Sequence, residues 1–295
     1  SNEYQSLQGQ LKGLDSIPVL DPKSGVNVPL AALIAQMEVS KKLVFSEEAI
    51  EKYRDSLYAK WSDENEKEFE VSKEYALKVV DRIAKWMGKD NYKETRTMPK
   101  YSVHADQPAR WQPTPPAYMD AVEPHWGKIR TLVMDSSAQF KAKAPFPFST
   151  DKSSDFYREA KETYDVGNKI SKDLLAMEKT KSTKIPEESA IATFWDCNPY
   201  ATVTQGHMMF AKKKNTPDAH WINIAKIACK TAKTDFNKTV FVYTKTSIGV
   251  FESFISCWDQ KFKTNVVRPE TYINQYIDEN WKPQLQTPPF PEYTS

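Results

Sequence analysis

Residues 254–269 read FISCWDQKFKTNVVRP, and this stretch decides the fold class and locates the candidate chemistry. Its apolar residues, traced back to residue 248, recur every three or four positions, which predicts a helix with one buried face over about residues 239–263. A short strand-like alternation at 239–243 lies within this helical context, and we expect the helix to override it. The chain is therefore expected to be all-α.

Two cations, Lys261 and Arg268, stand seven positions apart in this stretch, so an unbroken helix would point both the same way. Pro269 disfavours helical geometry at the residue before it, so we expect the helix to end at Arg268 and the guanidinium to turn inward. A converging arginine fork and lysine ammonium require an anion. The alternative is a solvated edge where both pair with carboxylates such as Asp259 or Glu270. Spacing by itself favours that alternative.

The composition excludes several classes of protein. Of the 295 residues, 12% are aromatic and 40% hydrophobic, which supplies a buried core and argues against disorder. A formal net charge of +2 predicts no nucleic-acid partner, because such proteins usually carry a basic excess. No apolar run approaches the roughly 20 residues of a membrane span. The three cysteines and four histidines have no metal-ligand spacing.

Capping residues and prolines predict how the chain is organised. We expect one helix to begin near Ser46, another to end at Met87 with Gly88 as its cap, and a third to open at Pro217. The proline-rich stretch 97–116 is expected to be an extended connection. We therefore expect two regions: 1–117, an N-terminal helical region with the proline-rich connection, and 118–295, a helical bundle that carries the first half of the candidate site.

The last eight residues add a second motif, PPFPEYTS over 288–295. Together with Lys261, Arg268 and Pro269 it resembles the first two motifs of the vanadium-dependent haloperoxidases, which are related to the type-2 phosphatidic acid phosphatases and bacterial acid phosphatases. The first motif is a lysine followed after six residues by Arg-Pro, and the second is a serine after Pro-Pro-Phe-Pro. Ser295 stands at that serine.

The haloperoxidase branch adds an aromatic pair, to which Trp258, three residues before the lysine, and Phe290, five before the serine, correspond. The segment FWDCNPY at 194–200 resembles an upstream segment of chloroperoxidase-type members. The nearest resemblance is to the bacterial vanadium iodoperoxidases, in which a tyrosine at the position of Tyr200 lines the pocket.

The resemblance implies a helical bundle of the vanadium haloperoxidase type that binds vanadate and oxidises a halide with hydrogen peroxide to hypohalous acid. Iodide is the expected halide. The implied catalytic and cofactor-binding residues are Lys261, Arg268 and Ser295, and the implied surrounding residues are Trp258, Phe290, Tyr200 and Asp259, the last as a partner that steers Lys261. For Trp258, a plain core role remains an equal alternative, since aromatic residues on helices usually belong to the core.

The family's axial histidine and third motif would lie beyond Ser295. We therefore expect no metal ligand within these residues, and we expect the chain to be the front part of a longer protein whose C-terminal segment completes the site. Because a strong oxidant would damage the cell, we expect an exported protein whose leader has been removed. Two alternatives remain open: an acid or lipid phosphatase that uses the same pocket, and a non-catalytic helical binding or scaffold protein. The oligomeric state is not indicated.

Overall fold

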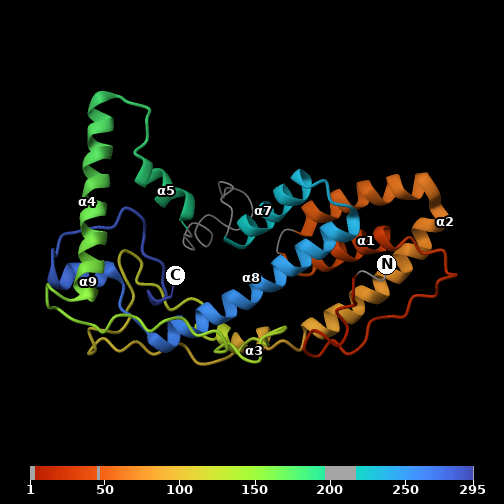
Figure 1. Ribbon diagram of the computed structural model, residues 1–295, viewed down its shortest axis with the longest axis horizontal. Coiled ribbons are helices and arrows are strands. Elements are labelled where there is room, and N and C mark those ends of the chain that lie inside the picture. Colours follow the sequence, from red (N-terminus) through yellow and green to blue (C-terminus); the bar gives the residue numbers. More distant parts are fainter. Residues whose placement is uncertain (1–3, 45–46, 197–216, 295) are drawn as a thin grey trace.

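The structure is a computed structural model that describes residues 4–44, 47–196 and 217–294 (Figure 1). The regular elements of these residues are helical, apart from one isolated bridge between Arg110 and Val266, which confirms the all-α prediction. None of the described helices combines the length and apolar character needed to cross a membrane. The helices are α1 (Val28–Lys41), α2 (Glu47–Met87), α3 (Tyr92–Thr95), a 3-10 turn η1 (Trp126–Lys128), α4 (Asp155–Thr180), α5 (Glu187–Trp195), α7 (Pro217–Thr231), α8 (Phe236–Thr264) and α9 (Pro269–Tyr276).

Helix α8 is the predicted central helix, and it joins the two ends of an elongated molecule (Figure 1). It starts where Asp235 accepts a hydrogen bond from the amide of Lys238, and it includes the stretch 239–243 with weak strand alternation. One end packs against α7, and the other lies toward α9 and the C-terminus. Ile255 on its buried face has no exposed surface.

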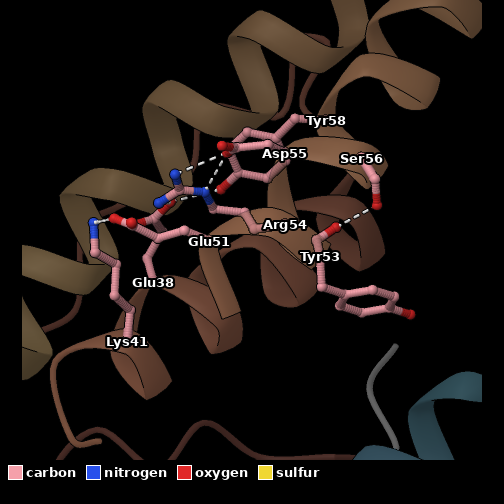
Figure 2. A network of polar contacts seen from close by, with 8 residues as sticks. All are labelled: Glu38, Lys41, Glu51, Tyr53, Arg54, Asp55, Ser56 and Tyr58. Carbon is pink, nitrogen blue, oxygen red and sulfur yellow. Dashed lines mark hydrogen bonds and ion pairs between the residues drawn. The ribbon is translucent and has the colours of Figure 1, made fainter. Parts of the chain in front are cut away.

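Helices α1 and α2 pack side by side at the N-terminal end of the molecule. The two helices predicted around Ser46 and before Gly88 both lie within α2, which consists of two helices joined at a kink at Asn65, where φ is −163° and ψ is 88°. Ser46 itself lies outside the described residues. The apolar core of this pair is supplemented by polar contacts that Figure 2 shows, centred on Glu38, Arg54 and Tyr58.

The proline-rich connection packs against the loop between α8 and α9. Trp111 is fully buried, its amide donates to the carbonyl of Asn265 at 3.0 Å, and the amide of Val267 donates to the carbonyl of Ala109 at 3.0 Å. These contacts cross the expected boundary after residue 117, which stays an expectation. The connection therefore helps to fix the loop that leads to Arg268.

The turn η1 is held close to α8 on another side. At Gly127 an added Cβ would lie 2.8 Å from the Cβ of Asp259, which leaves room only for glycine. Further along α8, the buried carboxylate of Glu252 accepts hydrogen bonds from the amides of Val133 and Met134, each at 3.1 Å. These contacts tie the segment after η1 to the helix that carries the candidate site.

Candidate oxyanion site

Lys261 lies in the last turn of α8 and is only 4% exposed. Its Nζ donates to the main-chain carbonyls of Pro291 at 3.4 Å and Glu292 at 3.1 Å. The pKa of Lys261 is lowered from 10.5 to about 8, mainly by burial and in smaller part by the charge of Arg268, against the opposing effects of Cys257 and Glu292. A buried ammonium with two carbonyl partners still carries an uncompensated positive charge.

Helix α8 ends close to residue 263, as its apolar period predicts, and not at Arg268, where Pro269 was expected to end it. Helix α8 stops at Thr264, Asn265 caps it in the left-handed conformation with φ 51°, and Arg268 is the N-cap of a separate helix, α9. Asparagine tolerates the left-handed region, and Pro269 at the start of α9 has the fixed φ that a first helical turn accepts. Lys261 and Arg268 therefore converge through a chain reversal between two helices, which replaces the expected ending of one helix at Arg268.

Arg268 is 8% exposed, and its guanidinium is partly used by the C-terminal segment. Its Nε donates to the carbonyl of Phe290 at 2.6 Å, and its Nη1 forms an ion pair with the carboxylate of Glu292. Its Nη2 is buried and has no hydrogen-bond partner among the described residues. A buried guanidinium nitrogen without a partner is costly, unless a ligand supplies an acceptor.

Residues 288–294 run beside both cations. The amide of Glu292 donates to the carbonyl of Val266 at 3.1 Å, and the hydroxyl of Thr264 donates to the carbonyl of Tyr293 at 3.3 Å. The thiol of Cys257 lies 3.5 Å from the carbonyl oxygen of Thr294. The segment thus reaches the cations next to the position of Ser295, but Ser295 itself lies outside the described residues, as does Tyr200.

The predicted aromatic pair lies against the cations. The rings of Trp258 and Phe290 are 5.0 Å apart between centroids, and Lys261 Nζ lies 5.1 Å and Arg268 Cζ 4.7 Å from the Phe290 centroid. The ring of Phe254 stacks on that of Trp258, with 4.1 Å between centroids. These rings cover the two cations with apolar surface and attract them through cation–π interactions.

Two carboxylates differ from the expectations. Asp259 was expected to steer Lys261, but it pairs with Lys263 at 2.6 Å, because positions four apart on a helix face each other. Arg268 pairs with neither Asp259 nor Glu270 but with Glu292, a residue that the sequence pattern did not single out. One sequence signal could have pointed to Glu292 as a partner of the cations: it is the one acidic residue in 288–295.

The arrangement fits a tetrahedral oxyanion such as vanadate or phosphate. Two buried cations share one nearby paired carboxylate, and a guanidinium nitrogen still lacks an acceptor among the described residues. An arginine fork and a lysine point charge are the usual partners of such oxygens. Because Lys261 and Arg268 are positively charged, they would bind the oxygens of the group and not its metal. Among the described residues, no cluster of His, Cys, Asp or Glu could hold a metal ion.

Comparison with solved structures gives a strong match. A crystal structure described as the first bacterial vanadium-dependent iodoperoxidase is 54% identical in sequence and superposes with a TM-score of 0.87. The alignment covers 99% of this chain and 66% of that protein, so the chain spans about two thirds of its length. No protein-family model matches the chain, and no curated protein matches it.

Proposed function

The chain belongs to the vanadium-dependent haloperoxidase family, and from this premise we propose that it forms part of an enzyme that binds vanadate and oxidises a halide with hydrogen peroxide. The proposed halide is iodide, and the proposed product is hypohalous acid. The observation that carries the proposal is the buried convergence of Lys261 and Arg268, with Arg268 Nη2 lacking a partner within the described residues.

The proposed roles follow from the contacts. Arg268 offers Nη2, Lys261 offers its ammonium, and Ser295 is proposed to offer its hydroxyl to the oxygens of vanadate. Bound vanadate supplies a Lewis-acid centre that activates hydrogen peroxide without a change of oxidation state. The two cations stabilise negative charge that develops on oxygen, and the surrounding rings strengthen this effect by excluding water.

Three further parts of the proposal concern residues outside the described ranges and the location of the protein. A histidine that would bind the vanadium is proposed to come from a further segment of the protein, which would act as the partner of this half of the site. Tyr200 is proposed to line the approach of the halide. We also propose an exported protein, because the product would damage cytoplasmic components, and cell fractionation tests that point.

The phosphatase alternative would use the same cations for a phosphate group. The aromatic pair favours the haloperoxidase, because Trp258 and Phe290 cover the cations with rings and leave an apolar approach. The two functions make opposite predictions. A phosphatase would hydrolyse phosphomonoesters and be inhibited by vanadate, whereas the haloperoxidase would gain its activity from vanadate.

The experiment uses the natural protein, freed of vanadate and then titrated with orthovanadate in the presence of iodide and hydrogen peroxide. We expect triiodide formation to rise with bound vanadate and to be lost in Lys261→Met. The matched control is Lys263→Met, which removes a lysine from the same turn that is exposed and pairs with Asp259. No gain of activity on adding vanadate would reject the proposal, and vanadate-inhibited phosphomonoester hydrolysis would favour the phosphatase.

A further inference from the structure

Glu292 contacts both cation-bearing elements of the candidate site through three groups. Its amide donates to the carbonyl of Val266 at 3.1 Å, and its carbonyl accepts from Lys261 Nζ at 3.1 Å. Its carboxylate pairs with Arg268 Nη1, where the arginine side chain is 9% exposed and the glutamate side chain 34%. One residue thus links the end of α8, the α8–α9 loop and the start of α9.

We propose that Glu292 is a positioning residue of the oxyanion site, which fixes the guanidinium of Arg268 so that Nη2 remains available to the bound anion. The inference deepens the proposed function and rests on it. Arg268 Nε is occupied by the carbonyl of Phe290 and Nη1 by Glu292, so the remaining nitrogen is the one without a partner in the described residues. The two occupied groups fix the plane of the fork, and the third nitrogen then has one orientation.

The charge of Glu292 also matters before an anion binds. Two cations buried together repel each other and lose hydration, so an arrangement without a counter-charge would be strongly unfavourable. The carboxylate of Glu292 compensates one of the two charges and leaves the other for the ligand. This division explains how Lys261 and Arg268 can stay buried and close together before the anion arrives.

A competing account makes Glu292 a stand-in that occupies the anion's place and must leave when the anion binds. The main-chain contacts oppose this account, because Val266 and Lys261 hold the backbone of Glu292 from both sides. The carboxylate also engages Nη1 and not Nη2, which lacks a partner among the described residues. The two accounts predict opposite effects of removing the charge.

The test measures the affinity of the natural protein for inorganic phosphate and orthovanadate by calorimetry. We expect Glu292→Gln, which keeps the shape but removes the charge, to bind both anions on the order of tenfold more weakly, as for loss of a charge-assisted hydrogen bond. Glu292→Asp keeps the charge and should recover most of the affinity. Glu279→Gln, at an exposed glutamate after α9, is the matched control and should bind like the wild type.

Each outcome decides between the accounts. Equal or tighter binding by Glu292→Gln would overturn the positioning role, and so would a lowered melting temperature with unchanged affinity. If Glu292→Gln does not fold, as judged by circular dichroism, Glu292→Ala is measured in its place, and weaker binding by that variant supports the role whereas equal or tighter binding overturns it. Wild-type protein that binds phosphate but shows no vanadate-dependent iodide oxidation would reject the proposed function while leaving this test in force. Wild-type protein that binds neither anion would reject both.

Discussion

Two regions of the molecule contain networks of charged residues beside aromatic rings, and they differ in how far each positive charge is compensated. Between α1 and α2, Arg54 contacts carboxylate oxygens of Glu38 at 3.3 Å and Asp55 at 2.8 Å, and the hydroxyl of Tyr58 donates to Glu38 at 2.9 Å (Figure 2). Lys41 pairs with Glu51 in the same network. Each cation shown there has a carboxylate partner, so the network is complete without a ligand.

At the end of α8 the positive charges are not all matched by carboxylates. Lys261 contacts main-chain carbonyls, Arg268 has one carboxylate, and one guanidinium nitrogen has no hydrogen-bond partner within residues 4–44, 47–196 and 217–294. A balanced network stabilises the packing of two helices, whereas a buried surplus of positive charge is retained at a cost in stability. The comparison indicates that an uncompensated positive charge, and not the mere presence of ion pairs, identifies the ligand site.

The largest expected effect comes from replacing an arginine by lysine in each region and comparing the two variants. Arg268→Lys keeps the charge but removes the fork, so we expect about a hundredfold loss in vanadate-dependent iodide oxidation, the scale for removing one preorganised donor. Arg54→Lys makes the same change in the α1–α2 network and should leave that rate unchanged. Steady-state kinetics with iodide and peroxide measure both, and equal losses in the two variants would break the distinction between the regions.

A second prediction concerns pH and anion binding. Because burial lowers the pKa of Lys261 to about 8, the ammonium loses its proton as pH rises through that value. Phosphate keeps a single charge state from there to about pH 10, so its affinity should fall over this range through the lysine. Calorimetric titrations at several pH values test this, and an affinity that stays constant would contradict the lowered pKa.

The same pKa has the opposite consequence for the stability of the anion-free protein. Between about 8 and the ordinary value of 10.5, the unfolded chain binds a proton at Lys261 that the folded chain does not, so the free energy of unfolding should rise with pH. Every pH unit that separates the folded and unfolded pKa values corresponds to about 1.4 kcal/mol. Denaturant unfolding of Lys261→Met should lack this rise, and a rise that persists in the variant would have another source.

The smallest expected effect belongs to the balanced network. Burial and the hydrogen bond to Glu38 raise the pKa of Tyr58 above its ordinary value of 10.0, so its contribution to stability is present below that pH and lost above it. We expect Tyr58→Phe to lower the free energy of unfolding by about 1 kcal/mol near neutral pH, the usual net value of one hydrogen bond. Urea unfolding measures this loss. Anion affinity should not change, and a parallel loss of phosphate binding would show that the two regions are coupled.

The sequence predicts the helices better than the turns between them. The three-to-four period of α8 and the proline that opens α7 are local signals, and both helices lie where these signals place them. The chain reversal at Asn265 was missed because a left-handed cap at asparagine is an option and not a requirement of the sequence. The pairing of Arg268 with Glu292 joins residues 24 positions apart, which no helical spacing predicts.

Within the site, motif spacing located Lys261, Arg268, Trp258 and Phe290, and the structure places these four side chains together. The resemblance implied that Asp259 steers Lys261, and the structure pairs that carboxylate with Lys263. Ser295 and Tyr200 stay predictions, since both lie outside the described residues. Motif spacing therefore identified Lys261 and Arg268, whereas only the tertiary contacts show that the carboxylate paired with Arg268 is Glu292.

The most direct measurement is a crystal structure of the natural protein soaked with orthovanadate, with the vanadium located from its anomalous scattering. We predict vanadium between α8 and α9, with its oxygens within hydrogen-bond distance of Arg268 Nη2 and Lys261 Nζ, and with Glu292 still paired to Nη1. Vanadium bound elsewhere, or a site in which neither cation contacts an oxygen of the anion, would contradict the central claim.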